Sequence, residues 1–137
     1  MTVSVIVPTL NEESTLAGLL DSLDEVRPDE VIVSDGGSTD RTIEIAAGRA
    51  RVVSGPPSRG VQLNAGAAAA SGDVLLFLHS DARLHPSADA AERRALEDPA
   101  VLGGNFDLRF DGETWAGSVF TWINRQRRAC AIWRPAQ

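Results

Sequence analysis

The sequence predicts an α/β fold, a Rossmann-like domain whose mainly parallel sheet carries helices on both faces. Short, β-branched apolar runs alternate along the chain with segments whose leucines or alanines recur at helical spacing. This alternation is typical of parallel sheets built from right-handed strand–helix–strand units. The first apolar run, residues 3–8, has almost no polar side chains, which is typical of a strand covered on both faces.

The first strand and helix are expected within residues 3–23. After the strand at 3–8, Asn11 can cap a helix, because its side chain accepts a hydrogen bond from a free backbone N–H. Glu12 and Glu13 suit the positive N-terminal end of that helix. Its apolar face is predicted from leucines at helical spacing: Leu16, Leu19, Leu20 and Leu23.

The next elements repeat the strand and helix alternation. In order they are expected at residues 30–34, 39–50, 51–55, 60–70, 73–81 and 86–96. Ser38 or Thr39 is the expected cap of the helix at 39–50, since hydroxyl side chains favour that position.

The C-terminal part is less regular than the rest. Residues 101–110 predict one more strand, and residues 113–128 resemble a helix. A stripe of large and small apolar side chains runs along this helix and beyond it: Trp115, Val119, Trp122, Ala129 and Trp133. Such a tail packs on the sheet, or leaves an apolar stripe exposed, or lies on a membrane surface, where Trp and Arg are common.

Composition limits the function classes. The 137 residues suit one domain, and a net charge of −6 disfavours nucleic acid as a partner, since no basic field attracts phosphate backbones. Cys130 is the only cysteine, so an internal disulfide is excluded and the cytoplasm is the default compartment. No apolar run approaches the roughly 20 residues needed to cross a bilayer.

Polar clusters follow three of the predicted strands: residues 8–12, 35–38 and 79–81. In open α/β sheets, ligands bind beyond the carboxyl ends of the strands, so these clusters mark a candidate site. Each cluster also has a purely structural interpretation as helix caps and tight turns. Capping does not explain Asp35, whose carboxylate could accept a nucleobase N–H, while Gly36 and Gly37 let a ribose approach the backbone.

Asp81 is the candidate metal ligand, because an Asp emerging from a buried strand can bind a hard divalent cation together with substrate phosphates. The alternative is a turn or cap residue. His79 is a second candidate ligand, although Mg²⁺ and Mn²⁺ favour oxygen and His is more often a hydrogen-bonding neighbour. Arg59, just before a predicted helix, could hold a phosphate with free backbone N–H groups, or could simply be exposed.

Taken together, the motifs VSVIVPTLNEE, EVIVSDGGSTDRT and RGVQLNAGAAAASGDVLLFLHSD resemble the nucleotide-sugar half of family-two glycosyltransferases with the GT-A fold. The resemblance covers about residues 3–110. Within that family, RGVQLNAG and FLHSDARL resemble the subgroup named for arsenosugar biosynthesis. The resemblance implies inverting glycosyl transfer from a nucleotide-diphosphate sugar, a UDP-sugar for most members, to an unknown acceptor, with Mn²⁺ or Mg²⁺ as cofactor.

The resemblance also assigns roles to individual residues. The metal is expected at Asp81, with His79 at the position where the family has the first acidic residue of its Asp-x-Asp motif. Asp35 is expected to bond the base. The complete set expected to line the nucleotide is Pro8, Asn11, Glu12, Asp35, Gly36, Arg59, Asn64 and Ser80.

No match to the family's general base or acceptor motifs follows residue 110. We therefore expect residues 1–110 to form the nucleotide-sugar-binding domain and residues 111–137 to begin an acceptor-binding half that this truncated chain lacks. A transferase, a catalytically inactive nucleotide-sugar-binding fragment and a nucleotidyltransferase remain as alternatives; the last lacks the basic, glycine-rich motif expected after the first strand.

Overall fold

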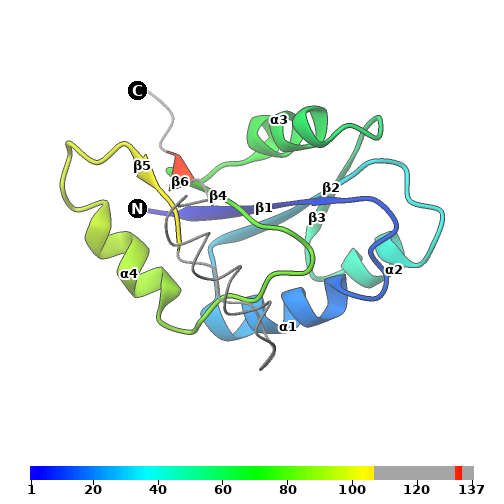
Figure 1. Ribbon diagram of the computed structural model, residues 1–137, viewed down its shortest axis with the longest axis horizontal. Coiled ribbons are helices and arrows are strands. Elements are labelled where there is room, and N and C mark those ends of the chain that lie inside the picture. The colour runs from blue at the N-terminus through cyan, green and yellow to red at the C-terminus, as the bar shows by residue number, and fades with distance from the viewer. Residues whose placement is uncertain (107–131, 134–137) are drawn as a thin grey trace, which may run out of the picture.

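The computed structural model describes residues 1–106 and 132–133. In these residues strands and helices alternate as expected (Figure 1). The helices are α1 (Leu16–Val26), α2 (Thr42–Ala46), α3 (Arg59–Ala69) and α4 (Ala88–Ala95). The strands are β1 (Val3–Thr9), β2 (Glu30–Asp35), β3 (Arg51–Ser54), β4 (Val74–Phe77), β5 (Gly103–Gly104) and β6 (Ile132–Trp133).

The sheet has the strand order β3-β2-β1-β4-β6-β5. Strand β1 is central and pairs in parallel with both β2 and β4, and β3 pairs in parallel with β2. Strand β6 runs antiparallel to β4 and to β5. The prediction of a mainly parallel sheet is therefore confirmed for the part that contains the polar strand ends.

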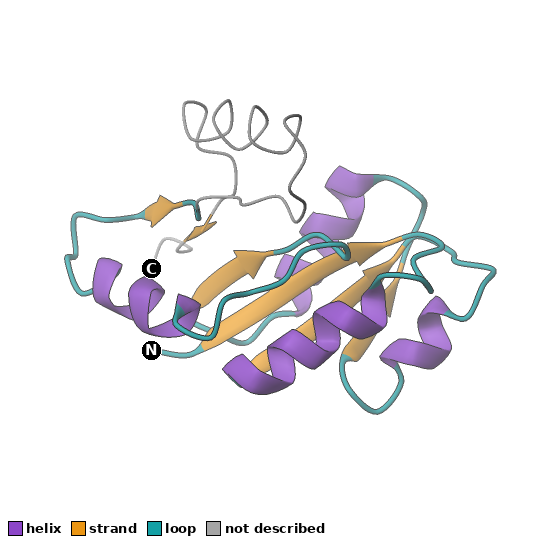
Figure 2. Cartoon of the chain, turned by 60° about the horizontal axis from the view of Figure 1, so that its bottom comes forward, coloured by secondary structure: helices purple, strands orange, loops and turns teal. Residues whose placement is uncertain are grey.

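Helices cover both faces of the sheet, as predicted. Helix α3 lies on one face, whereas α1 and α2 lie on the other (Figures 1 and 2). Side chains of β1 alternate between these layers, as the pleat requires. Val5 and Val7 join the buried leucines of α1 in the main apolar cluster, and Ile6 meets Gly66 of α3 on the opposite face.

Both predicted helix caps are wrong. Asn11 has a left-handed backbone (φ 56°), and a turn follows it, so α1 begins only after Thr15. Helix α2 is confined to Thr42–Ala46 and is shorter than residues 39–50, since Gly48 takes a left-handed φ of 78° soon after it ends. The side chains of Asn11 and Ser38 instead bond across the loops that follow β1 and β2.

The predicted C-terminal elements are only partly described. Of the strand expected at 101–110, the structure shows Gly103–Gly104, and the helix expected at 113–128 lies outside the described residues. Trp133, expected to continue the helical stripe, lies in β6 and pairs with Leu75 of β4. An otherwise open edge of β4 supplies the backbone groups that favour this extended conformation. None of the helices within the described residues has the length and apolarity needed to cross a membrane.

Substitution of Gly66 tests the contact between α3 and β1. A Cβ at this position would overlap the Cγ2 methyl of Ile6, which is fully buried. We expect Gly66→Ala to lower the free energy of unfolding by about 1–3 kcal/mol in urea denaturation. Gly60→Ala, in the same helix but facing open space, is the matched control and should be neutral or slightly stabilising. Equal effects of the two substitutions would contradict this packing.

Glu92 makes stability depend on pH. Its side chain is buried on α4, and Oε1 has no hydrogen-bond partner in the described part of the chain. Burial, together with the Asp89 carboxylate, raises the pKa of Glu92 from 4.5 to about 7. Because the folded state holds this proton more tightly than the unfolded state, stability falls as the pH rises from 4.5 to about 7 and the loss is constant above that.

Glu92→Gln should remove this pH-dependent loss. At about pH 8 we expect a gain of up to about 3 kcal/mol in unfolding free energy relative to the unaltered chain, shrinking towards pH 4.5. Urea denaturation across this range measures it. Glu97→Gln, at an exposed position near the end of the same helix, should show no such trend. A pH-independent difference for Glu92→Gln would disprove the assignment.

Candidate functional site

The polar clusters that follow β1, β2 and β4 lie at one edge of the sheet. Parallel pairing sets Thr9 opposite Asp35 at the carboxyl ends of β1 and β2. Strand β4, on the other side of β1, ends at Phe77, so the segment from His79 to Asp81 lies in the loop beyond it and not in the predicted strand. The fold therefore gathers three separate stretches of sequence at the position where α/β proteins bind ligands.

Asp35 is the buried centre of this edge, with no exposed surface. Its Oδ1 accepts hydrogen bonds from the hydroxyls of Thr9, at 3.1 Å, and Ser38. Its Oδ2 accepts the backbone N–H groups of Gly37 and Ser38, both at 2.8 Å. A carboxylate has about four lone-pair sites, and four donors already use them. In this geometry a nucleobase can bond Asp35 only if one hydroxyl donor moves away.

The charge of Asp35 is retained despite its burial. Burial alone would raise the pKa of this carboxyl, but the hydrogen bonds from Ser38, Gly37 and Thr9 outweigh it, so the pKa lies below its usual range. The loop is shaped to deliver these bonds, since Gly37 has a left-handed φ of 92°, which glycine adopts at little cost. The glycines and hydroxyls after β2 thus serve first to solvate one buried carboxylate.

The loops after β1 and β2 also bond to each other. Backbone N–H groups of the first loop donate to side chains of the second, and the Asn11 amide oxygen accepts the Thr39 N–H at 2.9 Å. The other bonded pairs are Asn11–Ser38, Glu12–Thr42 and Glu13–Asp40, at 2.9, 2.8 and 3.1 Å. Asn11 is therefore held by loop-to-loop bonds, whereas Glu12 also accepts the backbone N–H groups of Thr15 and Leu16 at the start of α1.

Gln62 is a residue of this site that the sequence analysis missed. Its buried Nε2 donates to the carbonyl oxygens of Thr9, at 2.7 Å, and Ser34, at 2.9 Å, and so ties α3 to the ends of β1 and β2. A Cβ on Gly36 would come within 3.1 Å of that same nitrogen. The sequence did carry a signal for Gln62. It is a polar residue four positions before Gly66, and this spacing places it on the buried side of an alanine-rich helix.

Arg59 and His79, predicted from different motifs, meet at the other side of this edge. The Arg59 Nη2 lies 3.0 Å from the His79 Nδ1, and both side chains are exposed. Arg59 is the first residue of α3, one position inside the helix that it was expected to precede. Asn64, on the exposed side of α3, makes no hydrogen bond to the other predicted residues within the described ranges.

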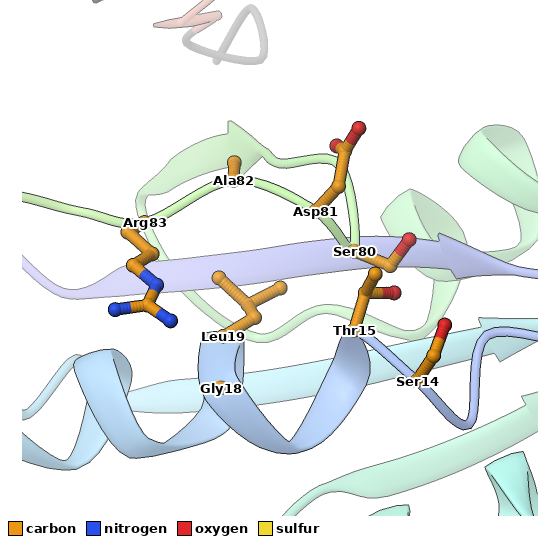
Figure 3. A pocket seen from close by; sticks show the side chains of 8 residues that line it. All are labelled: Ser14, Thr15, Gly18, Leu19, Ser80, Asp81, Ala82 and Arg83. Atoms are coloured by element: carbon orange, nitrogen blue, oxygen red, sulfur yellow. The ribbon is translucent and has the colours of Figure 1, made fainter. Parts of the chain in front are cut away.

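A hollow of about 160 Å³ lies between the first turn of α1 and the loop after β4 (Figure 3). The hydroxyls of Ser14, Thr15 and Ser80 gather at one end of it, and Arg83 lies at the other. Ser80 is almost fully buried, whereas Asp81 beside it is exposed and points outward. Of the predicted site residues, Ser80 and Asp81 line this small polar depression.

The donor set fits a cation that arrives with its substrate. Among the residues that the structure describes, no three His, Cys, Asp or Glu side chains converge into a closed metal site. Mg²⁺ is usually held by one or two carboxylates together with substrate phosphates, so the exposed Asp81 suffices for such a cation. His79, the second expected ligand, has its Nδ1 occupied by Arg59.

Comparison with known proteins identifies relatives of this chain. The family model for glycosyl transferase family 2 matches residues 4–134. Glucosyl-3-phosphoglycerate synthase of Mycobacterium tuberculosis is 42% identical over 93 residues, covering 58% of this chain and 29% of that protein. A PGL/p-HBAD biosynthesis glycosyltransferase of Mycobacterium bovis is 31% identical over 129 residues, covering 84% of this chain and 50% of the relative.

Solved structures share the fold. The crystal structure of the Mycobacterium tuberculosis synthase with Mn²⁺, UDP and glucosyl-3-phosphoglycerate superposes with a TM-score of 0.72 at 28% identity, covering 97% of this chain and 56% of that one. S. aureus TarS 1–349 gives a TM-score of 0.70 at 25% identity, covering 83% and 38%. The chain thus spans about half or less of the curated relatives it matches, and the predicted GT-A-type α/β fold is confirmed.

Asp35→Asn tests the buried carboxylate. The amide offers one acceptor and places N–H groups against donors, so we expect a loss of about 2–4 kcal/mol in unfolding free energy at neutral pH. The pKa of Asp35 is lowered by folding, so its stabilisation is present above about pH 4 and is lost as the pH falls through the folded value. Urea denaturation from about pH 7 to 2 should show the difference shrinking on acidification. Glu25→Gln, at an exposed position, is the control; a similar small effect of both would refute the network.

Proposed function

The chain belongs to glycosyl transferase family 2, and on that premise we propose that its carboxyl edge binds a nucleotide-diphosphate sugar, a UDP-sugar, together with Mn²⁺ or Mg²⁺. We further propose that the protein transfers the sugar to an acceptor. The observation that carries this proposal is the convergence of Asp81, Arg59 and the β1 and β2 loops on one edge of the sheet. The relative crystallised with Mn²⁺ and UDP supports the choice of donor and cation.

The nucleoside is proposed to bind against the loops after β1 and β2. Pro8, Asn11 and Glu12 form one wall, and the exposed backbone of Gly37 lies beside it. Gly36, expected to line the nucleotide, is buried against Gln62 and Pro57, so it acts by shaping the loop and leaves no open space for the ribose. Asp35 supports this wall from beneath through its bonds to Gly37 and Ser38, and reaches the base directly if the Ser38 hydroxyl turns away. The two loops bond each other without a ligand, so the nucleoside does not have to order them.

The diphosphate is proposed to bind between the start of α3 and the loop after β4. Arg59 would contact it from α3, and Asp81 would hold the cation from the loop after β4. Ser80 lies in the same loop as Asp81, and Asn64 lies on α3. A divalent cation supplies neutralisation of the charge that the leaving diphosphate gains. Arg59 adds a fixed positive charge that needs no protonation step.

Transfer also needs a base that accepts the proton of the acceptor hydroxyl. We assign none of the described residues to this role.

The division into a nucleotide-sugar-binding domain at 1–110 and the start of an acceptor-binding part at 111–137 stays a prediction. The arsenosugar subgroup, the cytoplasmic location and a membrane contact through the tail also stay predictions. A nucleotide-sugar-binding protein without turnover is the second candidate, favoured because no base is assigned among the described residues. Family membership disfavours the third alternative, a nucleotidyltransferase.

Asp81→Asn tests the donor site. Calorimetric titration with UDP should give binding to the unaltered chain that is at least about tenfold tighter with Mn²⁺ than with EDTA, because a cation held by Asp81 would offset the charge of the diphosphate. The variant should lose this metal dependence. Asp98→Asn, a carboxylate in the turn after α4, is the matched control. Equal affinity of the unaltered chain with and without Mn²⁺ would remove the role of Asp81.

Formation of free UDP from a UDP-sugar distinguishes an active transferase from a protein that only binds the nucleotide sugar. Incubation with UDP-sugars and Mn²⁺, followed by quantification of free UDP, reports turnover by transfer or hydrolysis. Binding without release of UDP would favour the second candidate.

A further inference from the structure

The contact between Arg59 and His79 has a chemical consequence for the loop after β4. A guanidinium has only N–H donors, so the 3.0 Å contact requires the His79 Nδ1 to act as acceptor. A neutral imidazole carries one hydrogen, which then lies on Nε2. With Nδ1 accepting and Nε2 protonated, neither ring nitrogen has a free lone pair for a metal ion.

The same contact leaves the charge of Arg59 available. Within the described residues Arg59 makes no ion pair with a carboxylate, although the chain is acidic overall. A carboxylate at the position of His79 would pair with Arg59 and neutralise part of its charge, whereas a neutral imidazole holds the guanidinium in place without neutralising it.

We propose that His79 is a positioning residue that fixes the Arg59 guanidinium for the donor's diphosphate, and that it is not a metal ligand in this chain. This inference rests on the proposed function, because it requires a diphosphate at this edge. Long arginine side chains lose rotamer freedom on binding, and a partner that restricts Arg59 beforehand lowers that cost.

Two replacements separate positioning from metal ligation. In His79→Asn the amide oxygen lies close to where Nδ1 was and can still accept from Arg59, whereas the side chain of His79→Gln carries its polar atoms nearer to the position of Nε2. We expect His79→Asn to keep UDP affinity within about threefold, and His79→Gln and His79→Ala to weaken it about tenfold. Rescue by Gln and not by Asn would overturn the proposal.

Calorimetry on the full chain supplies readouts that a general structural defect would not reproduce. The affinity for uridine, which lacks the diphosphate, should be unchanged in His79→Ala. The ratio of UDP affinities with Mn²⁺ and with EDTA should equal that of the unaltered chain, whereas ligation by His79 would require this ratio to fall. His85→Ala, which removes the other histidine from an exposed turn, is the matched control.

A double-mutant cycle with Arg59→Ala tests the coupling directly. If His79 acts through Arg59, the double variant should bind UDP no more weakly than Arg59→Ala alone. Additive losses would overturn the proposal, as would unchanged UDP affinity in His79→Ala. The two levels of inference fail differently: an unaltered chain that binds no UDP removes the proposed function and this inference together, whereas normal UDP binding with inert His79 variants removes only the latter.

Discussion

The site depends on the charge of Asp35, which is buried where β1 and β2 end. Burying an ionised carboxylate costs several kcal/mol of desolvation free energy unless hydrogen-bond donors surround it. The chain meets this requirement with a hydroxyl from β1, two backbone N–H groups and a hydroxyl from the loop after β2. The loop conformation, including the left-handed Gly37, follows from the need to direct these donors at one carboxylate.

Hydrogen bonds from α3, on one face of the sheet, hold the carboxyl ends of β1 and β2 as well. Gln62 bonds the carbonyls of Thr9 and Ser34, next to the residues that surround Asp35. Because Gly36 has no side chain, α3 can approach closely enough for these bonds to form. The edge is therefore ordered from within the fold, and the proposed ligand would meet a surface that is already arranged for it.

The fold and the location of the site could be predicted from the sequence because both depend on short-range patterns. Leucine spacing indicates the one buried face of α1, the continuous apolar run indicates that β1 is buried on both faces, and the polar clusters follow their strands directly. The caps failed because a side chain such as Asn11 can satisfy a backbone N–H in its own helix or in a loop distant along the chain, and local sequence does not distinguish the two. Gln62 was missed for the same reason, since its hydrogen-bond partners lie in β1 and β2, far from α3 along the sequence.

The position of β6 affects how the protein forms as it is synthesised. All four parallel strands are made before residue 78, yet within the described residues the side of β4 away from β1 gains its backbone partners from Ile132 and Trp133. Until those residues leave the ribosome, β4 is an apolar edge strand with unpaired backbone groups, a state that favours pairing between chains. The pairing of β4 with β6 joins segments that are distant along the chain, and such non-local pairings form more slowly than local ones.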